Sequence, residues 1–233
     1  MRNLIASLFL VLSGMPVFAG DDGSLVVIEL YTSEGCSSCP PADEILTKLA
    51  DRDDVLALSL HVDYWDYLGW KDKFSIAKFT KRQEYYNMVL GSRYRLVTPQ
   101  MIFQGQSYVA GAKPNQVEAH LKKLENQTEK LTLNVEKQGE AFNINIDPNG
   151  ADISAADVII VHYIPNSISI IKAGENRGKT LNHTNIVTSW ERIGEWDGQS
   201  NLRINHSVPK GTHAAVIVQV EHSGPILAAR KLY

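Results

Sequence analysis

The N-terminal half of the chain alternates between apolar runs and segments with helical spacing. The run 25–31 is almost wholly apolar, which is typical of a strand that is buried on both faces of a sheet. Gln104-Gly105-Gln106 separates two short apolar runs in the manner of a hairpin turn. The predicted strands are 25–31, 55–62, 100–103 and 107–109, and the predicted helices are 42–50, 74–89 and 114–124. This order predicts an α/β unit whose first strands are parallel and joined by a right-handed crossover.

From about Thr128 the pattern changes to short alternating runs, separated by turn signals such as Asp147-Pro148-Asn149-Gly150. The predicted strands of this half are 131–136, 141–146, 158–163, 168–172, 202–206, 214–220 and 227–232. Many short strands at this spacing are typical of a sandwich. The whole pattern predicts an α/β domain over 24–126, followed by an all-β, sandwich-like domain over 128–233.

Residues 1–19 have the pattern of a secretory signal peptide. Arg2 supplies a positive start, 4–12 is largely apolar, and Ala19 ends a Val-Phe-Ala sequence that suits cleavage. The alternative is an uncleaved anchor helix. Pro16 and the short apolar run argue against it, because a membrane span needs about 20 residues. We therefore expect a periplasmic or secreted protein, cleaved after Ala19, without stable membrane insertion.

Composition and charge mainly narrow the range of partners. The 233 residues are 44% hydrophobic and 21% charged, with a formal net charge of −3. A near-neutral chain without a basic cluster argues against nucleic acid as a partner. Residues 174–179 resemble a phosphate-binding loop only loosely, because the P-loop spacing and its final Lys-Ser/Thr pair are missing. We expect a β-turn with a buried Glu–Arg contact there, and we predict no cofactor.

Cys36 and Cys39 are the only cysteines, and they lie between the first predicted strand and the first predicted helix. Two thiols with this spacing and placement have the geometry of a thiol–disulfide redox site. Two cysteines alone cannot complete a tetrahedral zinc site, and closing so short a loop gives little entropic stabilisation. The pair therefore predicts redox chemistry, with a disulfide that merely pins the turn as the alternative.

The order of elements around this pair resembles the thioredoxin superfamily. Thr98-Pro99, just before the third strand, matches the position where that superfamily keeps a cis-proline opposite its redox pair, and an ordinary trans proline is the alternative. The resemblance implies that Cys36 is an exposed nucleophile and Cys39 the resolving thiol. Together they would exchange disulfides with protein thiols or protein disulfides through a mixed disulfide.

The chain also resembles a secreted bacterial family, domain of unknown function 1223. The matching segments are 31–43 (YTSEGCSSCPPAD), 61–70 (HVDYWDYLGW), 98–101 (TPQM) and 174–178 (GENRG). This resemblance implies a thioredoxin-like fold, and it supplies neither a substrate nor an activity.

Pro40-Pro41 changes the expected start of the helix. A proline disfavours helical backbone in the residue before it, so Cys39 is expected to be extended and the helix to begin near Pro41. Cys36 would then lie further from the helix amides that favour a thiolate. The sequence therefore predicts a weakened helix effect on the first thiol.

The other candidate site residues are polar. Ser37 and Ser38 can donate hydrogen bonds to sulfur, whereas Glu34 near the sulfur would disfavour the thiolate. His61 and Asp63 end the second strand, at the sheet edge where α/β sites gather. Three interpretations stay open for His61: proton transfer during exchange, copper binding together with both cysteines, and simple packing.

For the remaining segments the sequence predicts structural roles. Residues 82–86 are expected on a helix surface. His183 and Asn185 are expected to join 174–179 in docking the β-domain against the redox edge. The aromatic residues expected to pack as a lid are Tyr64, Trp65, Tyr67 and Trp70.

The sequence thus favours an exported thiol–disulfide oxidoreductase and leaves its status as an enzyme open. One alternative is a non-catalytic binding module on the same scaffold. The other is a copper-handling protein that uses Cys36, Cys39 and His61. The sequence does not specify an oligomeric state.

Overall fold

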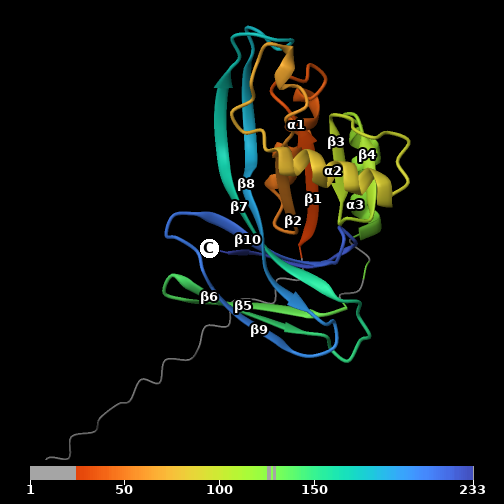
Figure 1. Cartoon of the computed structure of the whole chain (residues 1–233), viewed down its shortest axis with the longest axis vertical. Coiled ribbons are helices and arrows are strands. Elements are labelled where there is room, and N and C mark those ends of the chain that lie inside the picture. Colours follow the sequence, from red (N-terminus) through yellow and green to blue (C-terminus); the bar gives the residue numbers. More distant parts are fainter. Residues whose placement is uncertain (1–24, 125–126, 128–129, 233) are drawn as a thin grey trace, which may run out of the picture.

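The computed structural model describes residues 25–124, 127 and 130–232 (Figure 1). The predicted signal peptide, 1–19, lies outside the described residues. The helices are α1 (Pro40–Ala50), α2 (Ala77–Val89) and α3 (Pro114–Leu124), with a short 3-10 helix η1 (Asp66–Leu68). The strands are β1 (Val26–Thr32), β2 (Val55–His61), β3 (Gln100–Phe103), β4 (Ser107–Ala110), β5 (Thr132–Gln138), β6 (Ala141–Asp147), β7 (Ala156–Ile170), β8 (Thr180–Trp196), β9 (Leu202–Ser207), β10 (His213–Val220) and β11 (Ile226–Leu232).

Strands from both halves of the chain form one mixed sheet of eight strands, in the order β11-β10-β7-β8-β2-β1-β3-β4. β1 and β2 are parallel, as predicted, and Val26 pairs with Val55 at the start of the ladder. β8 is parallel to β2 and joins it where Ser59 pairs with Ile186. The remaining strands form a three-stranded sheet, β5-β6-β9.

The expected fold class, a thioredoxin-like α/β domain followed by a separate β-sandwich, is wrong. β2 does not end a small α/β sheet, because β8 pairs with it and the sheet continues through β7, β10 and β11. Three α-helices accompany eleven strands among the described residues, so the chain is mainly β. An open strand edge exposes unpaired backbone groups, and β8 covers part of that edge of β2. The domain limits at 126 and 128 stay a prediction, but the large sheet takes strands from both sides of them.

Most individual elements lie where the hydrophobic pattern predicted them. The first three strands, α1 and α3 begin and end within two residues of their predicted limits. β7 merges the predicted strands 158–163 and 168–172 into one, and β8 was not predicted. The β7–β8 ladder contains two register shifts. These shifts interrupt the two-residue period from which strands are predicted.

Helices cover both faces of the N-terminal part of the sheet. On one face, Leu46 of α1 and Leu121 of α3 pack with Ile28 of β1. On the other face, Phe79 of α2 packs with Val27. These side chains are at most 1% exposed, and burying one such side chain completely stabilises the fold by about 1.5–3 kcal/mol. Because both sides of β1 are covered, its sequence is almost wholly apolar, and the main exception is Glu29.

A buried ion pair holds α2 on this sheet. Arg82 donates to both carboxylate oxygens of Glu29, at 2.7 and 2.8 Å, and Tyr86 donates to the same carboxylate at 2.8 Å. Glu29 is 1% exposed, and Arg82 also donates to Gln219 of β10 at 2.9 Å. The expectation that 82–86 form a helix surface is therefore wrong for Arg82 and Tyr86, which reach inward to a charge on the strand.

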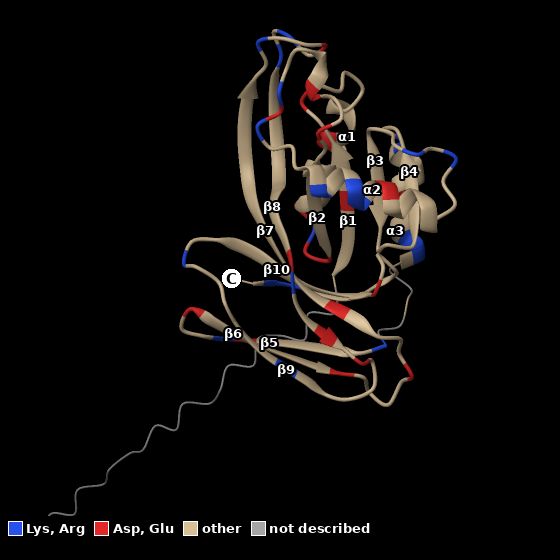
Figure 2. Ribbon diagram, in the orientation of Figure 1, with Lys and Arg blue, Asp and Glu red and all other residues tan. Residues whose placement is uncertain are grey.

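Charged residues of both signs are spread over the described structure (Figure 2). Basic residues gather at the tip of the β7–β8 hairpin, where Lys172, Arg177 and Lys179 are exposed. Within the described ranges, no helix has both the length and the apolar character needed to span a membrane.

Glu29→Ala should lower the free energy of unfolding by about 3–5 kcal/mol, because it leaves the nearly buried Arg82 guanidinium without its partner. Arg95→Ala is the matched control, since Arg95 pairs with Glu84 at an exposed site where an ion pair contributes about 0–1 kcal/mol. Urea unfolding of both variants with the disulfide intact measures the difference. Equal losses in the two variants would contradict a structural role for the buried pair.

Candidate functional site

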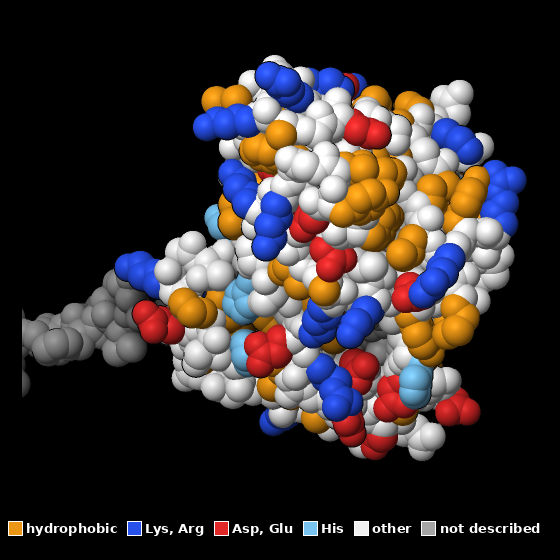
Figure 3. Space-filling view, turned by 45° about the horizontal axis from the view of Figure 1, so that its top comes forward, with side chains coloured by type: hydrophobic (Ala, Val, Ile, Leu, Met, Phe, Trp, Pro, Cys, Tyr) orange, Lys and Arg blue, Asp and Glu red, His pale blue; other side chains and the backbone are white. Residues whose placement is uncertain are grey.

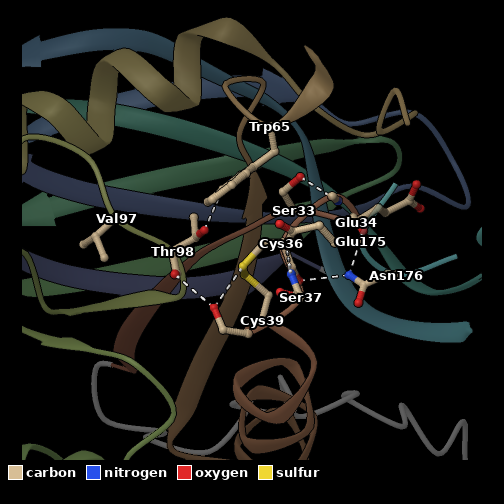
Figure 4. Close-up of a disulfide and its surroundings, with 12 residues drawn as sticks. Ser33, Glu34, Cys36, Ser37, Cys39, Trp65, Val97, Thr98, Glu175 and Asn176 are labelled. Atoms are coloured by element: carbon tan, nitrogen blue, oxygen red, sulfur yellow. Dashed lines mark hydrogen bonds between the residues drawn. A yellow bond between two sulfur atoms is a disulfide. The ribbon is translucent and has the colours of Figure 1, made fainter. Parts of the chain in front are cut away.

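Cys36 and Cys39 form a disulfide in the turn between β1 and α1 (Figure 4), with Cα atoms 5.4 Å apart. Cys36 is 1% exposed and Cys39 is 0% exposed. The expectation of an exposed Cys36 is therefore wrong for the disulfide form. A reaction partner can reach its sulfur only after the neighbouring groups move.

The start of α1 differs from the expectation. The helix begins at Pro40, and Cys39 has helical backbone angles, φ −78° and ψ −38°, rather than extended ones. The Cys39 carbonyl accepts hydrogen bonds from the backbone of Ala42 and Asp43 at 2.8 and 3.1 Å. These bonds hold Cys39 in a geometry that a following proline usually disfavours. Because Pro40 and Pro41 have no N–H, the first turn offers fewer amides to the first cysteine than an ordinary helix start.

Ser38 provides a polar contact to the first cysteine. Its hydroxyl oxygen lies 3.4 Å from Cys36 Sγ and 3.5 Å from the carbonyl oxygen of Thr98. The hydroxyl therefore stands between the redox turn, a name used for residues 33–39, and the Thr98 loop that faces it. Ser37 is exposed, and its backbone N–H donates to Glu175 at 3.3 Å.

The loop that faces the disulfide is held by Trp65. The Thr98–Pro99 peptide bond is cis, as predicted. Trp65 Nε1 donates to the Thr98 hydroxyl at 2.7 Å, and a Cβ added to Gly35 would lie 3.0 Å from Trp65 Cβ. Trp65 thus spans from the turn that carries the disulfide to the Thr98 loop. Of the expected aromatic lid, Tyr67 is instead 79% exposed.

The turn between β7 and β8 packs on the redox turn. The side-chain amide of Asn176 donates to the carbonyl oxygens of Glu34 and Cys36, both at 2.9 Å, and Asn176 is 0% exposed. The predicted docking of this segment against the redox edge is confirmed. The predicted buried Glu–Arg contact is wrong, because Glu175 and Arg177 are both exposed.

A buried cluster of histidines and carboxylates adjoins the redox turn through Glu34. His61 Nδ1 lies 2.6 Å from Asp72 Oδ2, and the same oxygen accepts the backbone N–H of Glu34 at 2.8 Å. His183 Nε2 lies 3.3 Å from Glu34 Oε1, and the rings of His61 and His183 have centroids 5.0 Å apart. All four residues are at most 3% exposed. The predicted place of His183 in the interface is confirmed.

His61 and Asp72 stabilise each other's charged form. Burial disfavours protonation of His61, but its hydrogen bond to the Asp72 carboxylate and the negative charge there raise the pKa of His61. Burial likewise disfavours the ionised carboxylate, but His61 lowers the pKa of Asp72. Below the raised pKa of His61, the two form a charged pair inside the protein.

Two further carboxyl groups flank the cysteines, and their pKa values shift in opposite directions. Burial disfavours ionised Glu34, but the side chains of His183, Ser169 and Trp70 lower the pKa of Glu34. Asp43 follows Cys39 by one helical turn, and burial raises the pKa of Asp43 to about 6. The site is therefore negatively charged on the strand side and titratable near neutrality on the helix side.

Asp63 and His61 are not brought together with the cysteines as metal ligands. Asp63 accepts a hydrogen bond from Thr80 of α2 at 2.5 Å, and His61 is bonded to Asp72. Across residues 25–124, 127 and 130–232, no three His, Cys, Asp or Glu side chains are arranged to hold a metal ion. The copper site with Cys36, Cys39 and His61 gains no support from this geometry.

Sequence reasoning missed Asp72. It lies between Lys71 and Lys73 in a loop, and that local pattern is the same as for a solvated charge. Its partner His61 and its other partner Glu34 belong to different strand ends, so no spacing in the sequence points to it. Asn176 was noticed within its segment, but its contact with Cys36 joins residues 140 positions apart.

The comparisons with known proteins cover both halves of the chain. Residues 27–221 match the family described as "Protein of unknown function (DUF1223)". The chain is similar to a protein from Agrobacterium tumefaciens known from an X-ray crystal structure, with 32% identity and a TM-score of 0.75 over 90% of this chain and 94% of that chain. It is similar in fold to HBP35 of Porphyromonas gingivalis, with 16% identity and a TM-score of 0.53 over 90% of this chain and 75% of that chain. No curated protein matches it.

Ser38→Ala should slow alkylation of reduced Cys36 by iodoacetamide about two- to threefold at pH 7. A lost hydrogen bond of about 1 kcal/mol lowers the thiolate fraction roughly fivefold, and the higher nucleophilicity of the less stabilised thiolate offsets part of this. Ser37→Ala is the matched control, because exposed Ser37 contributes its backbone N–H to the site. At pH 10 the Ser38→Ala rate should reach or exceed that of the wild type. A rate still reduced at pH 10 would point to lost access instead.

The free energy of unfolding should fall as pH rises above about 6.5. The pKa of His61 is raised in the folded protein, so its contribution is fully present below the unfolded value, about 6.5, and is lost as pH rises through the folded value. The raised pKa of Asp43, about 6, acts in the same direction at lower pH. The lowered pKa of Asp72 acts oppositely, and its contribution is lost only in acid.

His61→Gln should flatten the decline above pH 6.5, whereas His222→Gln, at a side chain 78% exposed, should leave it unchanged. Urea unfolding at steps of pH, with the disulfide intact, gives the slope for each protein. The same slope in His61→Gln as in the wild type would show that another group carries the pH dependence.

Proposed function

The chain belongs to the DUF1223 family, and we propose that it is a thiol–disulfide oxidoreductase that acts outside the cytoplasm. The observation that carries the proposal is the Cys36–Cys39 disulfide at the start of α1, beside the Thr98–Pro99 loop. Ser38 lies between the two, within hydrogen-bond distance of sulfur and of the Thr98 carbonyl. A disulfide that merely pinned a short turn would not need this contact.

The proposed reaction passes through a mixed disulfide. A partner thiolate attacks Cys36 Sγ and forms a new S–S bond, and the Cys36–Cys39 bond breaks. Cys39 leaves as a thiolate and takes up a proton. A second partner thiolate then attacks the partner sulfur of the mixed disulfide, and Cys36 leaves as a thiolate. The partner loses two electrons, the cysteine pair gains them, and the reverse sequence reduces a partner disulfide.

Residues around the pair have separate roles in this proposal. Groups around Cys36 must move before a partner reaches it, because the cysteine is buried, and we assign this movement to Trp65, which is bonded to the facing Thr98 loop. Ser38 then donates to the Cys36 thiolate in place of the amides that the two prolines lack. The relation to the thioredoxin superfamily is proposed for this local arrangement, a Cys-x-x-Cys turn facing a cis-proline, and not for the fold of the whole chain.

Export and the class of partner are part of the proposal. The pattern of residues 1–19 supports export, and an oxidising compartment lets a disulfide persist. Protein thiols and disulfides are the proposed partners. The face drawn in Figure 3 has hydrophobic, basic and acidic side chains side by side, a mixture that interfaces share with the rest of a protein surface.

A binding scaffold with a structural disulfide is the second candidate, and the burial of Cys36 and Cys39 favours it. Structural disulfides typically have reduction potentials below about −300 mV. Equilibration with dithiothreitol buffers would measure the potential. A value well above −300 mV supports the oxidoreductase, and a lower value supports the scaffold.

Cys39→Ser should accumulate a mixed disulfide on Cys36 when incubated with a disulfide-containing test protein, because the resolving thiol is missing. Cys36→Ser is the matched control and should form little adduct, since it lacks the proposed nucleophile. Mass spectrometry after acid quenching measures the adduct. No adduct in Cys39→Ser, with its thiol shown to be reduced, would contradict the proposed activity.

A further inference from the structure

We infer that Asn176, in the turn between β7 and β8, is a positioning residue that holds the redox turn in its disulfide-forming geometry and lowers the reduction potential of the cysteine pair. This deepens the proposed function and rests on it only in treating the pair as one that cycles between disulfide and dithiol. Asn176 lies 140 residues from Cys36 in the chain. The proposal therefore assigns the β-rich half a direct part in the redox site.

The side-chain amide of Asn176 is fully engaged at this contact. One N–H donates to the carbonyl of Glu34 and the other to the carbonyl of Cys36, so the amide spans Gly35 between them. The oxygen of the same amide accepts from Lys179 Nζ at 2.8 Å. An amide side chain has two donors and one acceptor oxygen, and all three functions are used here. A side chain without both donors could not hold both carbonyls.

The turn that presents Asn176 is itself fixed in place. Gly174 has a φ of +72°, and a Cβ added to it would lie 3.1 Å from Trp70 Cβ and 3.4 Å from the carbonyl oxygen of Leu68. Gly178 N–H closes the turn by donating to the carbonyl of Ile171 at 2.8 Å. The turn therefore packs against the loop that carries Leu68 and Trp70 on one side, and it holds the redox turn on the other.

The two cysteines are held by different parts of the protein. Cys39 is fixed by α1, whose first backbone N–H groups bond to its carbonyl. Cys36 lies outside the helix, and its carbonyl accepts from Cys39 N–H at 3.3 Å and from Asn176 at 2.9 Å. Fixing two reacting groups beside each other raises their effective concentration. The contact with Asn176 should therefore favour disulfide over dithiol.

Asn176→Ala should lower the equilibrium constant for forming the Cys36–Cys39 disulfide about tenfold, which raises the potential by about 30 mV. The measurement is equilibration with reduced and oxidised glutathione, in which two glutathione thiols give two electrons and two protons to the pair and leave as glutathione disulfide. Arg177→Ala is the matched control. It is in the same turn, but its side chain is exposed and it should leave the potential within about 5 mV of the wild type.

A merely structural role gives a different result. Loss of packing would destabilise the disulfide and dithiol forms alike and leave the potential unchanged, and that outcome overturns the inference. Urea unfolding of both forms checks it independently, because the expected loss is larger in the disulfide form. If Asn176→Ala does not fold, Lys179→Ala tests the inference instead, because it removes the donor that orients the Asn176 amide. It should give a smaller rise in potential, and no rise overturns the inference.

The two proposals fail separately. The potential is a property of the cysteine pair in glutathione buffer, and the mixed disulfide of Cys39→Ser depends on a protein partner. A shifted potential in Asn176→Ala without any adduct in Cys39→Ser would support the positioning role and overturn the proposed function. An adduct in Cys39→Ser with an unshifted potential in Asn176→Ala would support the proposed function and overturn the positioning role.

Discussion

The parallel pairing of β8 with β2 is the constraint on which the rest of the structure depends. It places the β7–β8 hairpin beside α1 and carries its turn to the redox turn. Three contacts follow from it: Asn185 Nδ2 donates to the Ala57 carbonyl at 2.9 Å, the hydroxyls of Thr47 and Thr184 lie 2.9 Å apart, and Asn176 bonds to Cys36. Without β8, one edge of β2 would be open, and the cysteine turn would lose the groups that hold it from outside. The site around Cys36 and Cys39 is thus assembled by both halves of the chain.

The chemistry of the site is consistent with a pair that prefers the disulfide. Pro40 and Pro41 remove amides that would favour a thiolate, and the pair is buried. Each of these effects disfavours a free thiolate. Ser38 acts in the opposite direction through a single hydroxyl at 3.4 Å. In the proposed redox cycle, a few polar contacts would therefore set the potential of this pair more than the helix dipole does.

The sequence revealed the local features of the molecule, and it did not reveal how the halves join. Continuous apolar runs identified β1 and β2, and helical spacing identified α3, because each signal is contained in a few adjacent residues. The cis bond at Pro99 was expected from the resemblance to the thioredoxin superfamily. β8 was missed since its buried residues, such as Leu181, His183 and Trp190, mix apolar and polar types and its ladder shifts register. Pairing between β2 and β8 joins residues more than 120 positions apart. A hydrophobic pattern carries no information on which distant strand pairs with β2. The expectation of two domains followed from this missing information.

The buried polar groups explain how so limited a strand pairing can have one register. β2 and β8 share the pair Ser59–Ile186, and apolar contacts alone would tolerate a slip along the strand. A slip by one residue would turn His183 to the opposite face of β8, away from Glu34, whose carboxylate and backbone contact His183 and Asp72. The same slip would leave a buried carboxylate and a buried histidine without their partners, which is costly. The histidine–carboxylate cluster therefore favours one alignment of the two halves, and that alignment is the one that brings Asn176 to the carbonyl of Cys36.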